Sequence, residues 1–221
     1  MEKGKLIVIE GACDGIGKST QFKRLKERLT EGGLEVVSHH FPSYGTPQAA
    51  DVEKYLSGEF GKPSELSPYF INELYAHDRK VTWDEVLKKE FDSNKVILLD
   101  RYTTSSLIYQ SALISDEEEK KKFIDWVVNY EYKKLGIKEP DKVIFLTAPF
   151  DIVTRLRSER KDNEGVVNDI HEQDLDFMKK VYENANYIAN YLNWDIIECS
   201  KNNQMLTIDE IHESIYQAIK K

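Results

Sequence analysis

The sequence predicts an α/β fold in which a five-stranded parallel sheet carries helices on both faces. Short apolar or β-branched runs alternate along the chain with longer segments whose apolar residues have helical spacing. The first two such runs are joined by one helical segment through short connections, an arrangement that makes neighbouring strands parallel. The 221 residues are enough for one domain with a full hydrophobic core, so we expect a single domain over 1–221.

The first predicted strand leads directly into a phosphate-binding loop. The apolar run 6–9 is followed by three glycines, a lysine and two hydroxyl residues. Glycines let backbone N–H groups come close to an anionic phosphate chain, and the helix that starts here offers its positive end. Lys18 would reach the outer phosphates and Ser19 would hold magnesium, which indicates a P-loop NTPase fold. The candidate ATP-binding residues are Gly11, Asp14, Gly15, Ile16, Gly17, Lys18, Ser19 and Thr20.

The next segments are assigned in chain order. Apolar residues at helical spacing predict a helix over 21–29 that ends at Gly32-Gly33, and β-branched residues predict a second strand over 34–40. Two prolines and a glycine in 41–47 predict a rigid loop at the carboxyl end of the sheet, where open α/β sheets bind ligands. The remaining elements of this half are a helix over 48–56, a connection over 57–68 and a helix from Pro68 to about Glu90.

A third predicted strand ends in a charged pair. Four consecutive apolar residues at 96–99 predict a fully buried parallel strand that delivers Asp100 and Arg101 to its carboxyl end. Asp100 could hold magnesium, directly or through water, and Arg101 could bind a phosphate with its fork of donors. A salt-bridged strand end without a ligand is the alternative.

The C-terminal half continues the alternation of helices and strands. Ser115 with Glu118 predicts a capping box for a charged helix. After Pro149 the chain becomes too polar to pack on two sides, which predicts a mobile flap, or lid, over about 155–168. The other elements are a helix over 103–112 with Ser105, Ser106 and Tyr109 on the ligand side, a strand over 142–147, a helix over 169–192 with Leu175 facing inward, a strand over 194–199 and a final helix capped by Thr207 and Glu210.

Charge and hydropathy exclude two classes of partner. The net charge of -8 argues against a surface that coats nucleic acid, so an anionic ligand must be met by a local group of basic residues. No apolar run approaches the ~18 residues that cross a bilayer, and the N-terminus lacks the long apolar core of a signal peptide. We therefore expect no nucleic-acid or membrane partner and a cytoplasmic protein.

Five motifs in this order resemble bacterial thymidylate kinase over nearly the whole chain. They are IEG…DGIGKSTQ at 9–21, FPSYGTP at 41–47, YAHDR at 75–79, DRYTTSSLIYQ at 100–110 and NDIHEQDLDF at 168–177. The resemblance implies a nucleoside monophosphate kinase domain that transfers the γ-phosphoryl group of ATP to dTMP, giving dTDP and ADP, in dTTP synthesis. It also implies Mg²⁺ as the cofactor and a homodimer.

The resemblance assigns roles around the base and sugar. Tyr75 matches the aromatic residue that stacks on thymine, and Arg79 matches the arginine that hydrogen-bonds the base edge. Ser106 and Gln110 fall where polar side chains meet the base. Tyr109 falls where an aromatic ring crowds the 2′ position and favours deoxyribose.

The resemblance also assigns roles around the phosphates. Tyr44 and Arg101 match groups on the acceptor phosphate, and Phe41 lines the pocket. Asp14 matches the loop carboxylate near the 3′-hydroxyl. Asp100 belongs to the magnesium site.

The catalytic arginine is expected in the lid. Gly15 stands where some family members carry an arginine in the phosphate loop. The transition state of phosphoryl transfer spreads negative charge over oxygens and needs a mobile cation. Arg157 or Arg160 is therefore favoured for that role, whereas Arg155 suits a helix surface, as in the bacterial type with its catalytic arginine in the lid. The resulting catalytic set is Lys18, Asp100, Arg101, Arg157 and Arg160.

The phosphate loop is one residue longer than the usual pattern. Gly11 stands one position further from the last glycine than expected, and Ala12 occupies the usual glycine position. Because the segment 14–19 keeps the family's spacing, we place the extra residue at Ala12-Cys13 and predict a local bulge there, with the phosphate cradle of 15–20 intact. A tight strand-to-helix turn without a ligand is the alternative reading of the loop.

Two other functions remain open at this point. A kinase of the same fold could act on another nucleotide, deoxynucleotide or deoxynucleoside, although Tyr75, Arg79 and Tyr109 favour a thymine deoxynucleotide. A non-catalytic nucleotide-binding switch would bind stoichiometrically and release negligible ADP with any monophosphate. An assay of ADP release over several acceptors separates these functions.

Overall fold

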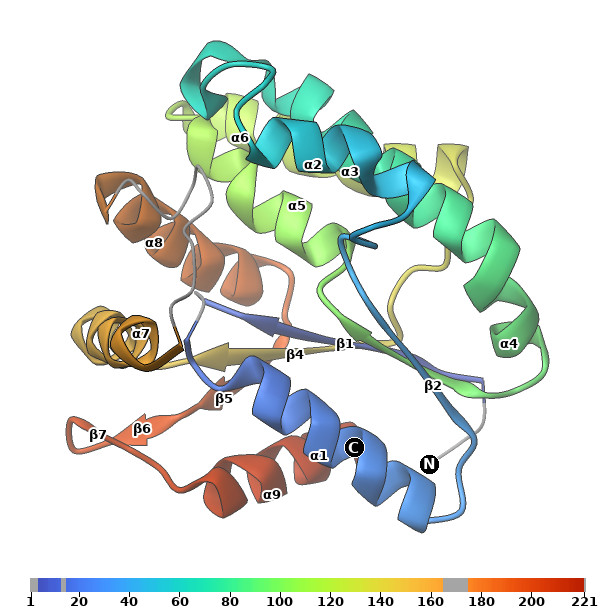
Figure 1. Cartoon of the computed structure of the whole chain (residues 1–221), viewed down its shortest axis with the longest axis vertical. Helices are drawn as coiled ribbons and strands as arrows, with labels where there is room; N and C mark the ends of the chain where they lie inside the picture. Colours follow the sequence, from blue (N-terminus) through green and yellow to red (C-terminus); the bar gives the residue numbers. More distant parts are fainter. Residues whose placement is uncertain (1–3, 13–14, 165–174, 221) are drawn as a thin grey trace.

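A parallel sheet forms the centre of the computed structural model, which describes residues 4–12, 15–164 and 175–220 (Figure 1). The sheet has five strands in the order β2-β3-β1-β4-β5, and each neighbouring pair is parallel. The predicted fold class is thus confirmed. The strands are β1 (Leu6–Gly11), β2 (Val36–His40), β3 (Val96–Asp100), β4 (Lys142–Thr147) and β5 (Asp195–Glu198).

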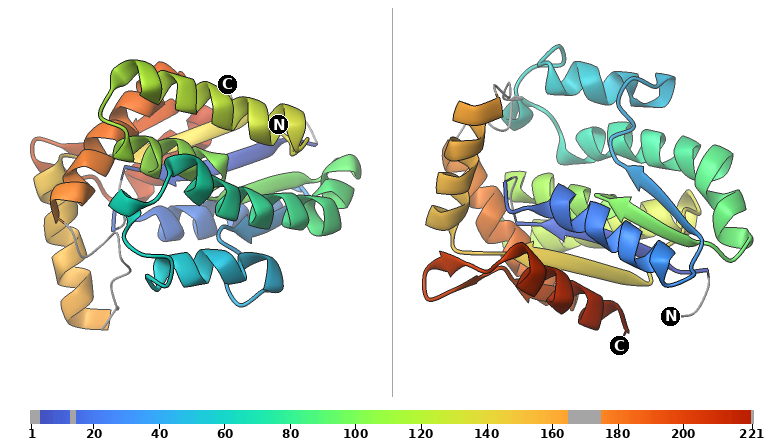
Figure 2. Two further views of the ribbon diagram at one scale, coloured as in Figure 1. Left: turned by 90° about the horizontal axis from the view of Figure 1, so that it is seen from above. Right: turned by 60° about the horizontal axis from the view of Figure 1, so that its bottom comes forward.

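Helices cover both faces of this sheet (Figure 1). Helices α1 and α9 lie side by side on one face, whereas α5, α6 and α8 lie on the other, with α2 and α3 outside α5 (Figures 1 and 2). Within the described residues, none of the helices has the length and apolar composition that a bilayer crossing requires. The helices are α1 (Lys18–Glu31), α2 (Ala50–Leu56), α3 (Pro68–Thr82), α4 (Lys88–Asp92), α5 (Thr103–Tyr109), α6 (Glu117–Val128), α7 (Phe150–Glu164), α8 (Leu175–Tyr191) and α9 (Ile208–Lys220).

The central strands are buried on both faces, as their unbroken apolar runs predict. Every residue of β1 and of β3 is buried. Successive side chains of a strand point to opposite faces. Accordingly, Ile7 and Ile9 belong to the larger hydrophobic cluster, whereas Leu6 and Val8 belong to a second one. The sheet is therefore anchored from both sides, and its carboxyl edge becomes a fixed platform for the loops.

One expectation for the C-terminal half is wrong, and another stays a prediction. The segment from residue 155 to Glu164, where we expect the lid, is the C-terminal part of α7, which projects beyond the carboxyl edge of the sheet (Figure 2). The segment 155–164 lacks glycine and proline and consists mostly of good helix formers, which explains its helical state. The remainder of the predicted lid, 165–168, lies outside the described residues. Leu175 is 68% exposed rather than inward, because the buried face of α8 begins only at Met178.

The helix caps agree in part with the sequence. The predicted box at α9 is confirmed, since the Glu210 amide donates to Thr207 Oγ1 and the Thr207 amide donates to Glu210 Oε2. At α6 the cap is Asp116, not Ser115, because the carboxylate of Asp116 accepts a hydrogen bond from the Glu119 amide at 2.9 Å.

A short hairpin before α9 was not predicted. It pairs β6 (Ser200–Lys201) with β7 (Gln204–Met205) in an antiparallel ladder. The two residues between the strands, Asn202 and Asn203, have φ angles of 50° and 63°. Asparagine tolerates this left-handed region, so the Asn-Asn pair was a turn signal in the sequence.

Candidate active site

The strand order brings three loops together at the carboxyl edge of the sheet. β3 lies between β1 and β2, with Ile9 opposite Asp100 on one side and His40 opposite Asp100 on the other. The phosphate loop after β1, the 41–47 loop after β2 and the charged end of β3 are therefore neighbours. This is the edge where an open α/β sheet binds its ligand.

The phosphate loop has the backbone conformation that its glycines predict. Gly15 and Gly17 have φ angles of 95° and 90°, a region that costs little only for glycine. Nothing lies within 4 Å of a Cβ added to Gly17, so its conformation, and not crowding, requires glycine there. Gly17 immediately precedes α1, and no side chain of the described residues caps the helix through a hydrogen bond. Its first amides therefore suit an anion.

Part of the predicted loop lies outside the described residues. This applies to the predicted ligand Asp14 and to Cys13, so the expected bulge at Ala12-Cys13 stays a prediction. Gly11 ends β1, and the Ala12 amide donates to the Leu146 carbonyl at 2.9 Å, which ties the start of the loop to β4. The side chain of Ile16 packs into the hydrophobic core, so only its backbone can face a nucleotide.

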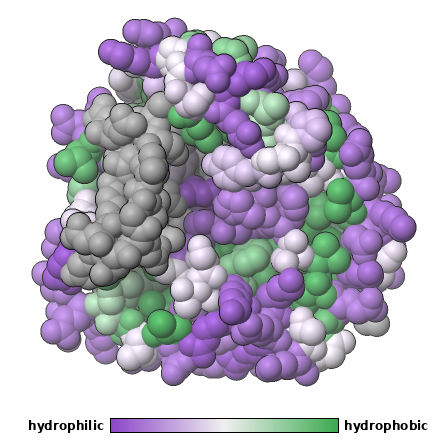
Figure 3. Space-filling model, in the orientation of Figure 1, coloured by the Kyte–Doolittle hydropathy of each residue, from purple (hydrophilic) through white to green (hydrophobic). Residues whose placement is uncertain are grey.

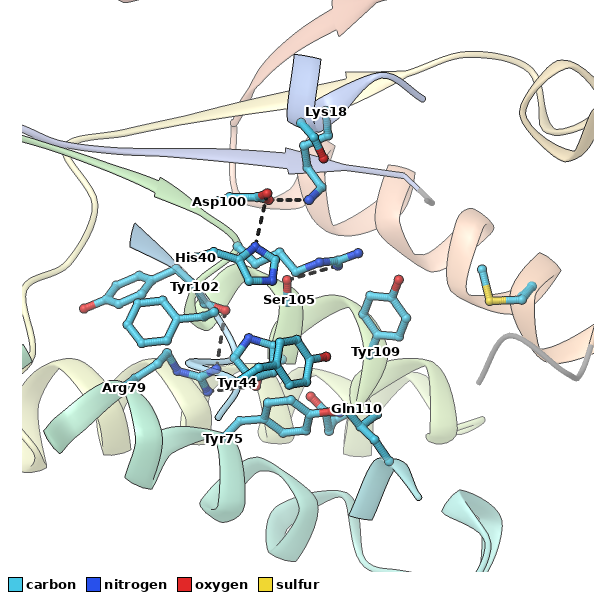
Figure 4. Close-up of a pocket in the computed structure, with 17 residues that line it drawn as sticks. Lys18, His40, Tyr44, Tyr75, Arg79, Asp100, Tyr102, Ser105, Tyr109 and Gln110 are labelled. Carbon is cyan, nitrogen blue, oxygen red and sulfur yellow. Dashed lines mark hydrogen bonds and ion pairs between the residues drawn. The ribbon is translucent and has the colours of Figure 1, made fainter. Parts of the chain in front are cut away.

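A buried ionic group links the loop to β3. Lys18 Nζ is paired with Asp100 Oδ1, and His40 Nδ1 lies 3.2 Å from Asp100 Oδ2 (Figure 4). Burial alone would raise the pKa of Asp100, but the hydrogen bond from His40 and the charge of Lys18 outweigh it and hold the pKa well below its ordinary value. Asp100 is therefore an anion at neutral pH.

Arg101 is held beside a buried acid at the end of the same strand. Its φ of 66° is in the left-handed region, an uncommon conformation for a residue with a side chain. Arg101 Nη1 lies 3.7 Å from Glu10 Oε1 and 3.5 Å from Ser105 Oγ. Glu10, which is fully buried, also accepts hydrogen bonds from the hydroxyls of Thr104 at 2.9 Å and Ser105 at 2.5 Å. The backbone conformation of Arg101 and the Glu10 carboxylate together determine the position of the Arg101 guanidinium in the absence of a ligand.

The loop after β2 is fastened to α3. The Ser43 amide donates to Asp78 Oδ2 at 2.8 Å, and the Ser43 hydroxyl lies 3.2 Å from that of Thr82. His39 Nε2 lies 2.8 Å from the same Ser43 hydroxyl, and burial lowers the pKa of His39. These contacts set the position of the adjacent Tyr44.

Arg79 forms the opposite, inner wall of the site. Its Nε and Nη2 donate to the two oxygens of Glu131 at 2.7 and 2.6 Å, and Nη2 also donates to Ser106 Oγ at 2.8 Å. Burial alone would lower the pKa of Arg79, but the Glu131 carboxylate raises it above its ordinary value. Glu131 was not singled out from the sequence, because a lone acid in a charged helical segment has no distinguishing pattern.

Residues from the start of α1, from α3 and α5 and from the ends of β2 and β3 line one cavity of roughly 1000 Å³, the open solvent at its mouth included. Figure 3 shows a hollow on this face of the molecule, and hydrophilic residues predominate where its border is coloured. Figure 4 shows the phosphate-loop lysine at one end and the aromatic residues of α3 and α5 at the other. The predicted residues that line it are Lys18, Ser19, Phe41, Tyr44, Tyr75, Arg79, Asp100, Arg101, Ser105, Ser106, Tyr109 and Gln110.

The cavity also has wall residues to which the sequence gave no role. These are His40, Leu56, Tyr102 and Met178. His40 could have been found from its place at the end of β2, directly across from Asp100. Met178 comes from α8, far along the chain, and its position depends on how that helix packs.

The proposed metal ligands share this cavity. Within the described ranges, no group of three or more His, Cys, Asp or Glu side chains is arranged to hold a metal ion. Asp100 and Ser19 both line the cavity, and an anionic carboxylate with a hydroxyl suits a hard cation. Such a donor set fits Mg²⁺ only if phosphate oxygens or water complete the coordination, as is usual for this ion.

The arginines predicted in the lid fall within α7. Arg157 and Arg160 belong to this helix, but their side chains lie outside the described part of the structure. Arg155, which we expected on a helix surface, is exposed. The choice between Arg157 and Arg160 therefore stays a prediction.

The fold and the cavity define a class of protein. A parallel sheet with a glycine loop at the end of β1, a lysine at the start of α1 and an acid at the end of the neighbouring strand is the arrangement of a P-loop phosphotransferase. The cavity has cationic side chains toward the loop and aromatic and polar ones opposite, which suits a nucleotide as acceptor.

Comparison with known proteins identifies the family. The sequence profile described as thymidylate kinase matches residues 9–215. The thymidylate kinase of Mycobacterium tuberculosis is 32% identical over 179 residues, covering 79% of this chain and 81% of that protein. The human thymidylate kinase is 27% identical, covering 96% of this chain and 88% of that protein. The chain belongs to the thymidylate kinase family, and its reaction is the phosphorylation of dTMP to dTDP.

A solved structure supports the same fold. The thymidylate kinase of Candida albicans superposes with a TM-score of 0.75 at 23% identity, covering all of this chain and 92% of that one. Relatives thus come from bacteria, fungi and animals, so similarity alone does not assign the chain to the bacterial type.

The paired state of Asp100 predicts a pH-dependent stability. Because the folded pKa is depressed, the pairing stabilises the fold above the unfolded pKa of about 3.9, and this contribution is lost as the pH falls below that value. Asp100→Asn is expected to lower the free energy of unfolding by about 3 kcal/mol at neutral pH. Urea unfolding at several pH values should show this difference shrinking below pH ~4. Asp125→Asn, at an exposed position of α6, is the matched control, and an equal loss for Asp100→Asn at every pH would contradict the assignment.

Proposed function

We propose that dTMP lies in the cavity with its base toward Arg79 and its phosphate toward Arg101 and the phosphate loop. The observation that carries this proposal is that one cavity joins Lys18 and Arg101 to the aromatic side chains of Tyr75 and Tyr109. Lys18 and Arg101 can stabilise anionic phosphates, whereas the rings of Tyr75 and Tyr109 can pack against a planar base and a sugar. The arrangement has the polarity of a nucleoside monophosphate followed by a phosphate chain.

The base end is proposed to read thymine through polar side chains. Ser106 contacts Arg79, Gln110 lines the same cavity, and Tyr75 extends from α3 one turn before Arg79 (Figure 4). In this arrangement Tyr75 stacks on the base, and Tyr109 crowds the 2′ position and disfavours ribose. Phe41 and Tyr44 close the side of the cavity formed by the loop after β2.

The donor end is proposed to bind ATP through the phosphate loop. The uncapped start of α1 and the left-handed glycines leave backbone donors for phosphates, and Lys18 is already inside the cavity. Asp14 is proposed to lie near the 3′-hydroxyl of the acceptor dTMP. Ser19 and Asp100 are proposed as the side chains that hold Mg²⁺ on the nucleotide. When bound, that ion would neutralise charge that develops on the transferring phosphoryl group.

Catalysis in this site rests on alignment and charge. The acceptor phosphate is already anionic, so no general base is needed, and the protein has to hold two phosphates in line and exclude water. Arg101, whose guanidinium is fixed by Glu10 and the strand end, is proposed to bind the acceptor phosphate. Lys18 is proposed to leave Asp100 and bind the transferring phosphates.

A steady-state assay of ADP release tests this function. dTMP is expected to be the best acceptor among dTMP, dUMP, dCMP, dGMP and thymidine, because only dTMP has the base, the deoxyribose and the phosphate that the cavity fits. Lys18→Ala is expected to lower kcat about a hundredfold or more, since it removes the cation from the transferring group. Lys23→Ala, on the exposed side of α1, is the matched control and should leave the rate unchanged. Stoichiometric binding without turnover, or equal turnover of all acceptors, would refute the proposal.

The catalytic arginine of the transition state is proposed to come from the lid at about 155–168. Gly15 supplies no side-chain cation in the phosphate loop, so α7 is the proposed source, as in the bacterial type. Arg157→Ala or Arg160→Ala is expected to lower kcat about a hundredfold or more, with little change in the KM for dTMP, because the cation acts in the transition state. Arg155→Ala is the matched control. If neither substitution lowers kcat more than this control, the cation has another source.

We also propose a homodimer. An aromatic group links α3 and α6, with ring centroids of Tyr69 and Trp126 4.8 Å apart and those of Trp126 and Tyr130 also 4.8 Å apart. Its members are only half-buried, which supports an interface there. Sedimentation velocity should give twice the chain mass, and Tyr130→Asp should shift the particle toward the monomer. Tyr191→Asp, at an exposed ring of α8, should not, and a monomeric wild type would exclude the dimer.

A further inference from the structure

Glu131 is a buried acid at the back of the base end of the cavity. It lies in the π-helical segment η5 (Asn129–Lys134), which follows α6 directly, and its side chain is fully buried. Both oxygens are used, one by Arg79 Nη2 and the other by Arg79 Nε. A two-pronged contact of this kind fixes the plane of the guanidinium as well as its position.

A third contact fixes the acid itself. Thr103 Oγ1, at the first residue of α5, donates to Glu131 Oε2 at 2.7 Å. Glu131 thereby connects η5 with α3, which carries Arg79, and with α5, which carries Ser106. Because all three elements meet at this carboxylate, its position sets the spacing between Arg79 and Ser106.

The donors of Arg79 can be counted one by one. A guanidinium has five N–H bonds. Glu131 takes Nε–H and one hydrogen of Nη2, and Ser106 Oγ takes the other at 2.8 Å, with Asn72 Oδ1 as a more distant acceptor 3.5 Å from Nη2. Nη1 has only the Tyr102 carbonyl, at 3.5 Å, so the part of the chain that the structure describes supplies no acceptor for its second hydrogen (Figure 4). That hydrogen is left for a ligand in the cavity.

The Ser106 hydroxyl is also oriented by Arg79 as a donor toward the cavity. Ser106 Oγ accepts from Arg79, so the lone pair facing the arginine is occupied and its own hydrogen is directed elsewhere. The inner wall thus presents N–H and O–H donors to the cavity, backed by a carboxylate that cancels the charge of the guanidinium. A donor wall pairs with a carbonyl oxygen and leaves an amino group unpaired.

We propose that Glu131 is a positioning residue that makes this wall select a carbonyl oxygen on the base and reject an amino group at the same place. This proposal rests on the proposed function, in which the base of the acceptor lies against Arg79. Thymine and uracil carry an oxygen at ring position 4, whereas cytosine carries an amino group there. If Arg79 were not fixed, its donors could turn away from the amino group and the penalty against cytosine would fall.

The test measures acceptor preference in Glu131→Gln. Glutamine keeps the size of the side chain but loses the charge and one of the acceptors. At saturating ATP, kcat/KM for dTMP relative to dCMP is expected to fall about tenfold or more, through a higher KM for dTMP and a lower KM for dCMP. The ratio of dTMP to dUMP should stay unchanged, because both bases carry the oxygen. The KM for ATP should also stay unchanged, because the phosphate loop is not involved.

Two further variants separate positioning from a structural role. Glu139→Gln, at an exposed position a few residues further along, is the matched control and should not alter either ratio. In an Arg79→Gln background, Glu131→Gln should produce no additional fall in the dTMP to dCMP ratio, because Glu131 acts through Arg79. If Glu131→Gln does not fold, Glu131→Asp, which keeps the charge but shortens the reach, should shift the same ratio by a smaller factor.

The outcomes are distinct. A Glu131 variant with a lower thermal midpoint but an unchanged dTMP to dCMP ratio would overturn the proposal, because it would show a structural role only. An equal loss for dTMP, dUMP and dCMP would overturn it as well. A wild-type enzyme without any preference for dTMP would instead refute the proposed function, before any variant is compared.

Discussion

Charge that is buried at the carboxyl edge of the sheet has to be compensated, and this requirement connects most of the functional residues. Removing one partner of a buried pair leaves an uncompensated charge, which costs several kcal/mol, so the groups are constrained in sets. Lys18 is set by Asp100, Arg101 by Glu10, and Arg79 by Glu131. The three cations of these pairs line one cavity, whereas Glu10 and Glu131 are buried behind it. Pairing with a carboxylate therefore fixes the position of each cation, both of those proposed to bind phosphates and of the one proposed to face the base.

Much of the fold could be predicted because its signals are local. The unbroken apolar runs of β1 and β3 are diagnostic of strands buried on both faces, and the Thr207 cap depends on residues only three apart. The errors arise where neighbouring residues offer the same local signal. Ser115 and Asp116 are both good N-cap residues, and it is Asp116 that caps α6.

The candidate site was predictable to the extent that it lies at strand ends. Parallel strands end at one edge, so motifs after β1, β2 and β3 had to meet, and the residues assigned there line one cavity. The buried partners were harder to predict. Glu131 lies 52 positions from Arg79 in the chain, and nothing in its local sequence distinguishes it from a solvated acid. Buried partners of this kind are brought together by tertiary packing, and the spacing of apolar residues along the sequence does not predict which side chains will meet.

The uncapped start of α1 has a consequence beyond nucleotide recognition. Helix α1 begins at Gly17, which has no side chain to accept a hydrogen bond from the first amides, as an N-cap serine or aspartate would. A phosphate chain that binds there completes the helix in the way that a capping residue otherwise would. The first amides of α1 are then the hydrogen-bond donors for the phosphate. Because the bound phosphate accepts these hydrogen bonds, the first turn of α1 is more stable when the site is occupied than when it is empty.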